Sequence, residues 1–484
     1  MRNWLPFLLT LFYLPLLAQS TVYQGFEADS AAEPRGGMLF LNSFIQINLR
    51  KPILAEAKGV GGLVVVSAIV ETDGHVSDVN VIKSLRPDCD REAVRVFSLY
   101  NAWKPAQKDE KVIRQRVSIP VTFKPNAPFI YTGGARINFF DTESKPIADS
   151  TKATYRQVTP LDTNGLPAGD IVLYKLKGTD WKEDVRLQFV RKINAYRNSA
   201  GQSVHLIGHQ NSDQEWEGQL VALNELGGRI HEEYYQNGKK IGPQLSYYEN
   251  GSIAEKTDDY DEKSVLTSWH PNGQIKQIRI ITKYKALSPG SPEQVMAFWD
   301  KMGNQSIKDG NGRAIYQTKA ISHGDTASKT QLVEQGLYKD GLKEGIWIGR
   351  YDDGSYFYEE QYDKGVCKNG KAKSVGGDTL RYLDAGRPPE FPGGMQALGQ
   401  FLSSNLRYPV EAQKAGVQGK VFVSFVVCTD GTLCDYEVLK GVHPTVDQEA
   451  LRVIKAMSGR WKPGVQRGEK VRVKYNLPIN FTLN

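Results

Sequence analysis

The last residues of the chain alternate between apolar and polar side chains with a period of two. The apolar positions are Val471, Val473, Tyr475, Leu477, Ile479 and Phe481, and the polar ones between them are Arg472, Lys474, Asn476, Pro478, Asn480 and Thr482. This pattern predicts a strand with one buried and one solvated face. Pro478 cannot donate a ladder hydrogen bond, so we expect the strand at a sheet edge. Such an edge either accepts an extended peptide or stays solvated and binds nothing.

A hairpin and a helix precede this strand. Residues 421–427 and 433–439 read as two strands joined by the turn signal Asp430-Gly431. Thr445 and Gln448 then have the spacing of a capping box, which predicts a helix start. The apolar stripe of this helix consists of Val446, Ala450, Val453, Ile454 and Met457. Stripes of this spacing are typical of core packing rather than of a cofactor site.

The same arrangement occurs twice in the chain. Gly36-Gly37-Met38 recurs as Gly393-Gly394-Met395, and this shift of 357 residues holds without a gap for about sixty residues. One added residue then aligns the remainder of both copies. A match of this length indicates an internal duplication. We therefore predict an α+β protein in which residues 34–125 and 387–484 each form a small domain with a two-stranded hairpin, a helix and an edge strand.

Four runs in the second copy resemble the C-terminal domain of TonB energy-transducing proteins. They are Tyr408-Pro409-Val410-Glu411-Ala412-Gln413, Gly419-Lys420-Val421, Asp447-Gln448-Glu449-Ala450 and Trp461-Lys462-Pro463-Gly464. The resemblance covers nearly all of residues 387–484. It is weaker over the degenerate first copy, where Lys51-Pro52 replaces the Tyr-Pro pair. It implies a periplasmic domain that captures a short extended segment of an outer-membrane receptor, the TonB box, by adding it to the sheet.

The resemblance also implies which residues would contact that segment. Carried over by position, they are Arg407, Tyr408, Pro409, Val471, Arg472, Val473, Lys474, Tyr475, Asn476 and Leu477. The implied partners are outer-membrane TonB-dependent receptors of a Gram-negative cell. Energy transduction would add an inner-membrane, proton-driven motor complex. A homodimer is a further arrangement that the sequence leaves open.

Residues 126–386 have a different texture, with short blocks rich in Tyr, Gly, Asn, Asp and Lys. Tyr234-Tyr235-Gln236-Asn237-Gly238 and Tyr247-Tyr248-Glu249-Asn250-Gly251 share one plan. Adjacent aromatic residues suit strands, and Asn-Gly supplies the positive φ angles of a tight hairpin. The blocks resemble the MORN-like repeats of the YwqK family. We expect a β-rich repeat region between the two end domains.

The first twenty residues indicate export. Arg2 precedes the apolar run from Leu5 to Leu17, and Ala18-Gln19-Ser20 has the small-x-small form of a cleavage site. We interpret residues 1–20 as a signal peptide, with an uncleaved inner-membrane anchor as the rival interpretation. A length of 484 residues suits three or four domains. The predicted location is the periplasm or cell envelope.

The chain has four cysteines, too few for a disulfide-built scaffold. Cys428 and Cys434 flank the Asp430-Gly431 turn, and either a disulfide across the hairpin or two reduced thiols fits the sequence. No nucleophile, phosphate-binding or dinucleotide motif occurs, so we predict neither an enzyme nor a cofactor or metal site. Each end domain carries a net charge near +5. Nucleic acid is disfavoured as its partner because the chain is predicted to be exported.

Two hypotheses follow for the function. In the first, the second copy binds receptor segments by β-strand addition, the repeats set its reach, and the protein couples energy to transmembrane transport. In the alternative, the chain is a periplasmic cell-envelope scaffold or adaptor that uses the TonB-like domain for protein interaction without energy transduction. A short apolar N-terminal segment and 23 prolines spread along the chain distinguish it from TonB proteins with a Pro-rich spacer.

Overall fold

The computed structural model describes residues 21–198, 201–283, 293–325 and 327–483. The chain divides into two compact units, one reaching to Ser306 and one beginning at Ile307. Strands make up 53% and helices 14% of the chain, which agrees with the α+β class. The predicted signal peptide lies outside the described residues. In the described part of the chain, no helix is both long enough and apolar enough to span a bilayer.

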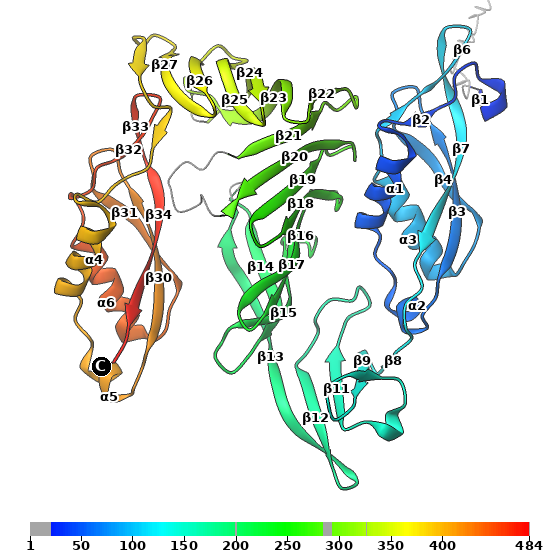
Figure 1. The fold of residues 1–484 in the computed structure, drawn as a ribbon, viewed down its shortest axis with the longest axis horizontal. Coiled ribbons are helices and arrows are strands. Elements are labelled where there is room, and N and C mark those ends of the chain that lie inside the picture. The colour runs from blue at the N-terminus through cyan, green and yellow to red at the C-terminus, as the bar shows by residue number, and fades with distance from the viewer. Residues whose placement is uncertain (1–20, 199–200, 284–292, 326, 484) are drawn as a thin grey trace, which may run out of the picture. The chain divides into compact units, whose positions relative to one another are not determined.

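The first unit begins with a domain in which helices lie against a sheet of order β1-β7-β3-β4 (Figure 1). Its elements are β1 (Val22–Tyr23), η1 (Gly25–Glu27), β2 (Glu33–Pro34), α1 (Gly37–Asn48), α2 (Ile53–Ala57), β3 (Gly62–Val70), β4 (Val76–Lys83), α3 (Pro87–Ser98), β5 (Trp103–Lys104), β6 (Ala106–Lys108) and β7 (Lys111–Phe123). We call it the N-copy. The pairs β3–β4 and β3–β7 are antiparallel.

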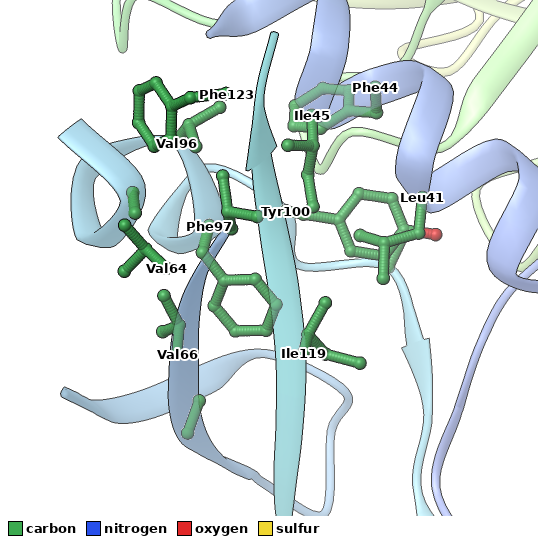
Figure 2. Close-up of a cluster of buried hydrophobic side chains, with 14 of the residues drawn as sticks. Leu41, Phe44, Ile45, Val64, Val66, Val96, Phe97, Tyr100, Ile119 and Phe123 are labelled. Carbon is green, nitrogen blue, oxygen red and sulfur yellow. The ribbon is translucent and has the colours of Figure 1, made fainter. Parts of the chain in front are cut away.

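The core of the N-copy lies between α1, α3 and the sheet (Figure 2). Phe44 from α1, Phe97 from α3 and Val66 from β3 are each fully buried within it. Apolar side chains at alternate positions of β7 point to the same side, because successive side chains of a strand face opposite ways. Ile119, Val121 and Phe123 are therefore buried, while Pro120 between them is exposed.

The second unit ends with the equivalent domain, which we call the C-copy. Its elements are β29 (Gly386–Arg387), α4 (Gly394–Asn405), α5 (Val410–Lys414), β30 (Gly419–Val427), β31 (Leu433–Lys440), α6 (Pro444–Lys455), β32 (Gly464–Gln466), β33 (Glu469–Val471) and β34 (Val473–Phe481). Its main sheet has the order β31-β30-β34. The five residues of the predicted apolar stripe on α6 and after it are all completely buried.

Two details of the C-copy differ from the sequence predictions. The helix α6 begins two residues earlier than expected, with His443 as N-cap and Pro444 in its first turn, so Thr445 is not the cap. The fixed φ of proline suits the first helical position, where the missing N–H is not needed. The predicted final strand is also interrupted, because β33 ends at Val471 and β34 begins at Val473, which leaves Arg472 between them.

Between the two copies lie antiparallel strands joined by short turns. The first unit holds β8 (Ile130–Thr132), β9 (Ala135–Phe140), β10 (Pro146–Ile147), η2 (Ser150–Lys152), β11 (Tyr155–Pro160), β12 (Ile171–Lys177), β13 (Asp180–Arg197), β14 (Ser203–Gln210), β15 (Trp216–Leu223), β16 (Arg229–Gln236), β17 (Lys239–Tyr247), β18 (Ile253–Asp259), β19 (Lys263–Trp269), β20 (Ile275–Thr282) and β21 (Gln294–Trp299). Asn237 and Gly238 both have positive φ, 50° and 69°, as a tight Asn-Gly hairpin turn requires.

The strands that precede the C-copy continue the same plan. They are β22 (Gln305–Lys308), β23 (Asn311–Ile321), β24 (Lys329–Lys339), β25 (Leu342–Tyr351), β26 (Tyr356–Asp363), β27 (Val366–Ser374) and β28 (Leu380–Tyr382). From β22 to β28, each strand pairs antiparallel with the next. Aromatic side chains such as Trp347 and Tyr358 pack over glycines of the neighbouring strand and are almost completely buried.

Each copy is fixed to the strands of its own unit in a different way. In the N-copy, the buried Asn48 at the end of α1 accepts a hydrogen bond from the backbone N–H of Ile253 in β18, at 2.7 Å. In the C-copy, Arg467 in the β32–β33 turn donates to the buried Glu360 of β26 at 2.9 Å. Its guanidinium also lies over the ring of Tyr358. The two copies therefore contact their neighbouring strands through different parts of the shared fold.

Candidate functional site

The candidate site is the free side of β34. This strand pairs with β30 along its whole length, from Val473 opposite Val427 to Phe481 opposite Gly419. On its other side, no strand among the described residues pairs with it. Side chains alternate along β34 as the sequence predicts, with Leu477 buried and Lys474 exposed. The exposed side of the strand is therefore a row of backbone groups flanked by polar side chains.

Pro478 identifies which backbone groups face outward. It stands opposite Phe422 in an intact antiparallel ladder although it has no N–H. In an antiparallel pair, residues alternate between those that bond to the partner strand and those whose N–H and C=O point away from it. Pro478 belongs to the second set. Asn476 and Lys474, two and four residues before it, therefore direct their N–H groups toward the free side.

In the N-copy the same side is already occupied. There β1 pairs in parallel with β7, with Val22 opposite Arg114 and Tyr23 opposite Gln115. The side chain of Gln115 holds the segment that follows β1, accepting a hydrogen bond from the N–H of Ala32 at 2.6 Å. The sequence predicts an edge strand in each copy. In the N-copy, a strand from the same chain covers part of that edge.

Arg407, Tyr408 and Pro409 lie at the other end of β34 from Val471. The ring of Tyr408 meets Phe481 edge-on, with 5.7 Å between ring centroids, and its hydroxyl donates to the carbonyl of Val417. Pro409 precedes α5 as its N-cap. Tyr408 thus supports the end of the strand. Arg407 alone of the three is exposed, and its backbone N–H donates to Glu449 at 2.6 Å.

The charged side chain of Glu449 holds the segment before α5 through hydrogen bonds. Arg452 donates to it twice, at 2.7 and 2.8 Å, and also donates to the carbonyl of Asn405 at 2.6 Å. Burial raises the pKa of Glu449, but the hydrogen bonds from Arg452 and from the backbone of Arg407 outweigh this and lower it overall. The carboxylate therefore stays charged at neutral pH and keeps the segment before α5 in place.

The remaining predicted contacts lie along the first half of β34 and in the two residues that precede it. Tyr475 is half-buried, and its ring packs 5.0 Å from that of Trp461. Lys474 pairs with Glu437 of β31 at 3.4 Å, and Arg472 pairs with Asp435 at 2.7 Å. These ion pairs are exposed and hold the basic side chains loosely. Val471 belongs to β33 rather than to β34.

Cys428 and Cys434 are free thiols whose sulfur atoms lie 2.7 Å apart. They stand on either side of the β30–β31 turn. Gly431 in this turn has a φ of +84°, and a Cβ there would lie 2.2 Å from the carbonyl oxygen of Trp461. The described residues contain no group of three or more His, Cys, Asp or Glu side chains that could hold a metal ion.

Sequence reasoning missed β1 and the carboxylate clusters of the central strands. Val22–Tyr23 is too short for a strand pattern, so its pairing depends on β7 being present. Glu232, Glu233 and Glu360 are buried, and each accepts a hydrogen bond from the tyrosine two residues later. The recurring Glu-x-Tyr spacing was the available signal, since residues two apart in a strand share a face.

Comparisons with known proteins agree with the duplication. The family model described as Gram-negative bacterial TonB protein C-terminal matches residues 48–125 and 404–483. The NMR structure of Helicobacter pylori TonB-CTD (residues 179–285) is 32% identical, covering 19% of this chain and 80% of that one, with a TM-score of 0.17. A shorter form (residues 194–285) is 30% identical, covering 18% and 91%, with a TM-score of 0.16. No curated protein matches the chain.

Proposed function

Because the chain belongs to the family of Gram-negative bacterial TonB C-terminal domains, we propose that its C-copy binds extended segments of outer-membrane receptors by adding them as a strand to β34. The free backbone groups of β34 would supply the affinity. The exposed side chains of Arg472, Lys474 and Asn476 would contribute to selectivity. The place of action is the periplasmic side of a Gram-negative cell envelope.

One observation carries this proposal, the difference between the outer sides of β7 and β34. In the N-copy that side accepts β1 as an added parallel strand. In the C-copy no described strand takes that place. The residues that correspond to β1 by the 357-residue shift are Thr379 and Leu380, and Leu380 belongs to β28, which pairs with β27. The C-copy therefore keeps its edge available for a strand from another molecule.

A second candidate function is a cell-envelope scaffold or adaptor without energy coupling. It is favoured by the N-copy, which uses the same fold as a structural module. Helix α1 of that copy buries Leu41, Phe44, Ile45 and Asn48, whereas only Leu398 is buried in α4 of the C-copy. Receptor binding by the C-copy fits both functions. They differ in whether a proton-driven motor complex of the inner membrane engages the chain.

The test is site-specific photo-crosslinking in the native envelope. A photoreactive side chain at Asn476 projects from the exposed face of β34 beside its free edge, and one at Ser118 occupies the matching position of β7. We expect crosslinks to the N-terminal segments of outer-membrane receptors from position 476 and not from position 118. Crosslinks to receptors from both positions, or from neither, would contradict the assignment of the site.

Asn476→Pro sharpens this test. It removes an outward N–H without touching the ladder to β30, as the native Pro478 already does. Receptor crosslinking from a probe at Asn480 should fall at least tenfold in this variant, while Asn476→Ala should retain it. Tyr475→Pro is the matched folding control, because it removes an N–H directed at β30 and should unfold the strand.

A further inference from the structure

An arginine stands at the same place in both copies. It is Arg114 at the start of β7 and Arg472 before β34. In the N-copy, Arg114 donates to both carboxylate oxygens of Glu71, at 2.6 and 2.7 Å. The hydroxyl of Ser77 also donates to Glu71. These hydrogen bonds hold β7 at Arg114, the residue that pairs with Val22 of β1. The arrangement is a charge-assisted, bidentate pair of the strong kind.

The same three positions of the C-copy carry a different chemistry. The 357-residue shift places Cys428 at the position of Glu71 and Cys434 at that of Ser77, and the added residue aligns Arg472 with Arg114. The Cys428 and Cys434 sulfur atoms lie 2.7 Å apart, and Arg472 donates to the sulfur of Cys434 at 3.3 Å. A carboxylate anchor has thus been replaced by a pair of thiols.

The strand itself also differs between the copies. In the N-copy, β7 runs without interruption from Lys111 to Phe123. In the C-copy, the strand is broken at Arg472, the one residue between β33 and β34. Arg472 keeps only the exposed Asp435 as a charged partner, at 2.7 Å. The end of β34 that corresponds to the β1-binding part of β7 is therefore the more loosely held of the two.

We propose that Cys428 and Cys434 form a redox site, and that its change between dithiol and disulfide sets how firmly Arg472 is held at the free edge of β34. The significance of Arg472 at the edge of β34 rests on the proposed function of that edge. The redox site itself rests on the geometry of the two thiols alone.

The reaction is a thiol–disulfide exchange. One cysteine, as thiolate, attacks the disulfide of an oxidant such as oxidised glutathione or a partner protein disulfide, forming a mixed disulfide and releasing one thiol. The other cysteine then attacks the mixed disulfide and releases the second thiol. The Cys428–Cys434 bond forms, both S–H protons pass to the released thiols, and the oxidant takes up two electrons. A sulfur–sulfur bond of about 2.05 Å needs only a small approach from 2.7 Å.

Oxidation changes what Arg472 can bind. A Cys434 thiol or thiolate accepts from the guanidinium, and the contact with Cys434, followed by Asp435, raises the pKa of Arg472. A disulfide sulfur carries no ionisable proton and is a weaker acceptor. Arg472 then depends on Asp435 alone, in an ion pair whose partners are 58% and 65% exposed. Such a pair contributes little, so we expect the start of β34 to loosen on oxidation.

The first experiment detects the disulfide in the full chain. The protein is equilibrated with oxidised glutathione or with dithiothreitol, unfolded, alkylated with N-ethylmaleimide and analysed by intact mass and peptide mapping. We expect four labels after reduction and two after oxidation, with Cys428 and Cys434 protected and Cys89 and Cys367 labelled. Labelling of all four cysteines after oxidation would overturn the proposal. Cys428→Ser should leave Cys434 open to glutathione.

The second experiment measures how stable the backbone around Arg472 is in the reduced and oxidised forms. Hydrogen exchange of residues 471–475 is compared in the two forms, with residues 113–117 of the N-copy as internal reference. Oxidation should speed exchange in the first segment about threefold, the effect of losing one modest hydrogen bond, and leave the second unchanged. Equal exchange rates in both forms would overturn the link between the thiols and the edge.

A double variant, Cys428→Glu with Cys434→Ser, supplies the matched control because it transfers the Glu71–Ser77 arrangement to the C-copy. It should slow exchange at residues 471–475 below that of the reduced protein, and glutathione should no longer change it. An exchange rate that remains sensitive to glutathione would show that the two sulfur atoms are not responsible. None of these readouts uses a receptor, so they fail or succeed independently of the crosslinking test.

Discussion

The N-copy and the C-copy share one fold, yet each exposes a different part of it. The N-copy buries its first helix against the central strands and covers its edge strand with β1. The C-copy leaves that helix mostly exposed and its edge strand free, and it is attached instead through Arg467 in the β32–β33 turn. One fold, duplicated within a chain, can thus have its edge strand covered by β1 in one copy and left unpaired among the described residues in the other.

The glycine of the hairpin turn should tolerate replacement by alanine equally poorly in both copies. Gly431 and Gly74 have φ angles of +84° and +89°, and a Cβ at either would lie within 2.3 Å of a tryptophan carbonyl oxygen. We expect Gly431→Ala and Gly74→Ala each to lower the free energy of unfolding of its own domain by about 4 kcal/mol. Urea denaturation followed by hydrogen exchange reports each domain separately. A large difference between the two variants would contradict the structural equivalence of the copies.

The attachment of the C-copy should depend on Arg467. Its guanidinium is paired with Glu360, whose side chain is completely buried, so Arg467→Ala leaves an unpaired charge in the interior. The expected cost is about 3 kcal/mol in the unfolding of the second unit. Asp109 occupies the same turn position in the N-copy, and Asp109→Ala should change the stability of the first unit by less than about 0.5 kcal/mol. Comparable losses in both variants would show that the turn serves the same role in each copy.

The attachment of the N-copy should depend on Asn48. Replacing it by Ala removes the acceptor of the Ile253 N–H in a buried position. We expect a loss of about 2 kcal/mol from the unfolding free energy of the first unit. The counterpart Asn405 is exposed, and its side chain donates to the carbonyl of Phe401 within its own helix. Asn405→Ala therefore serves as the control, and a loss as large as that of Asn48→Ala would contradict the proposed difference between α1 and α4.

The smallest expected effect is a dependence on pH that arises from Glu71, whose position in the C-copy is taken by Cys428. The hydrogen bonds from Arg114 lower the pKa of Glu71, so its folded-state pKa lies below that of the unfolded chain. The resulting stability is present above the unfolded pKa and is lost as pH falls through the folded one. Glu71→Gln should cost about 1 kcal/mol at pH 7 and less as pH falls below 4. Measured by urea titration, a cost that is constant over this range would refute the role of the carboxylate charge.

Local patterns identified much of each end domain. The alternation after Arg472 placed the buried and exposed faces of the last strand, and Asp430-Gly431 marked the hairpin between β30 and β31. These features depend on side chains a few residues apart, so the sequence contains all the information they require. The helix start was misplaced because the capping-box spacing of Thr445 and Gln448 competes with Pro444, which the structure uses instead.

The site was only partly predictable. The predicted contact of Tyr408 with a receptor segment stays a prediction, and the sequence did not reveal that its ring packs against Phe481. Val471 was expected in the edge strand, and it belongs to a separate hairpin. Both outcomes depend on side chains that are distant in sequence. The pairing of β1 with β7 joins residues 92 apart, from Val22 to Arg114, and two strand residues give no pattern to detect.

The sequence by itself determined that this protein carries one α+β domain twice, with repeated strands and Asn-Gly turns between the copies. Those properties arise from residue spacing, which the chain states directly. Only the tertiary structure decided which copy keeps a free edge, and which chemistry surrounds the arginine at that edge. These depend on where β1 and β28 find partners and on how Glu71 and Cys434 meet arginines that lie 43 and 38 positions away. Partner choice over such distances follows from the folded sheet and cannot be read from local pattern.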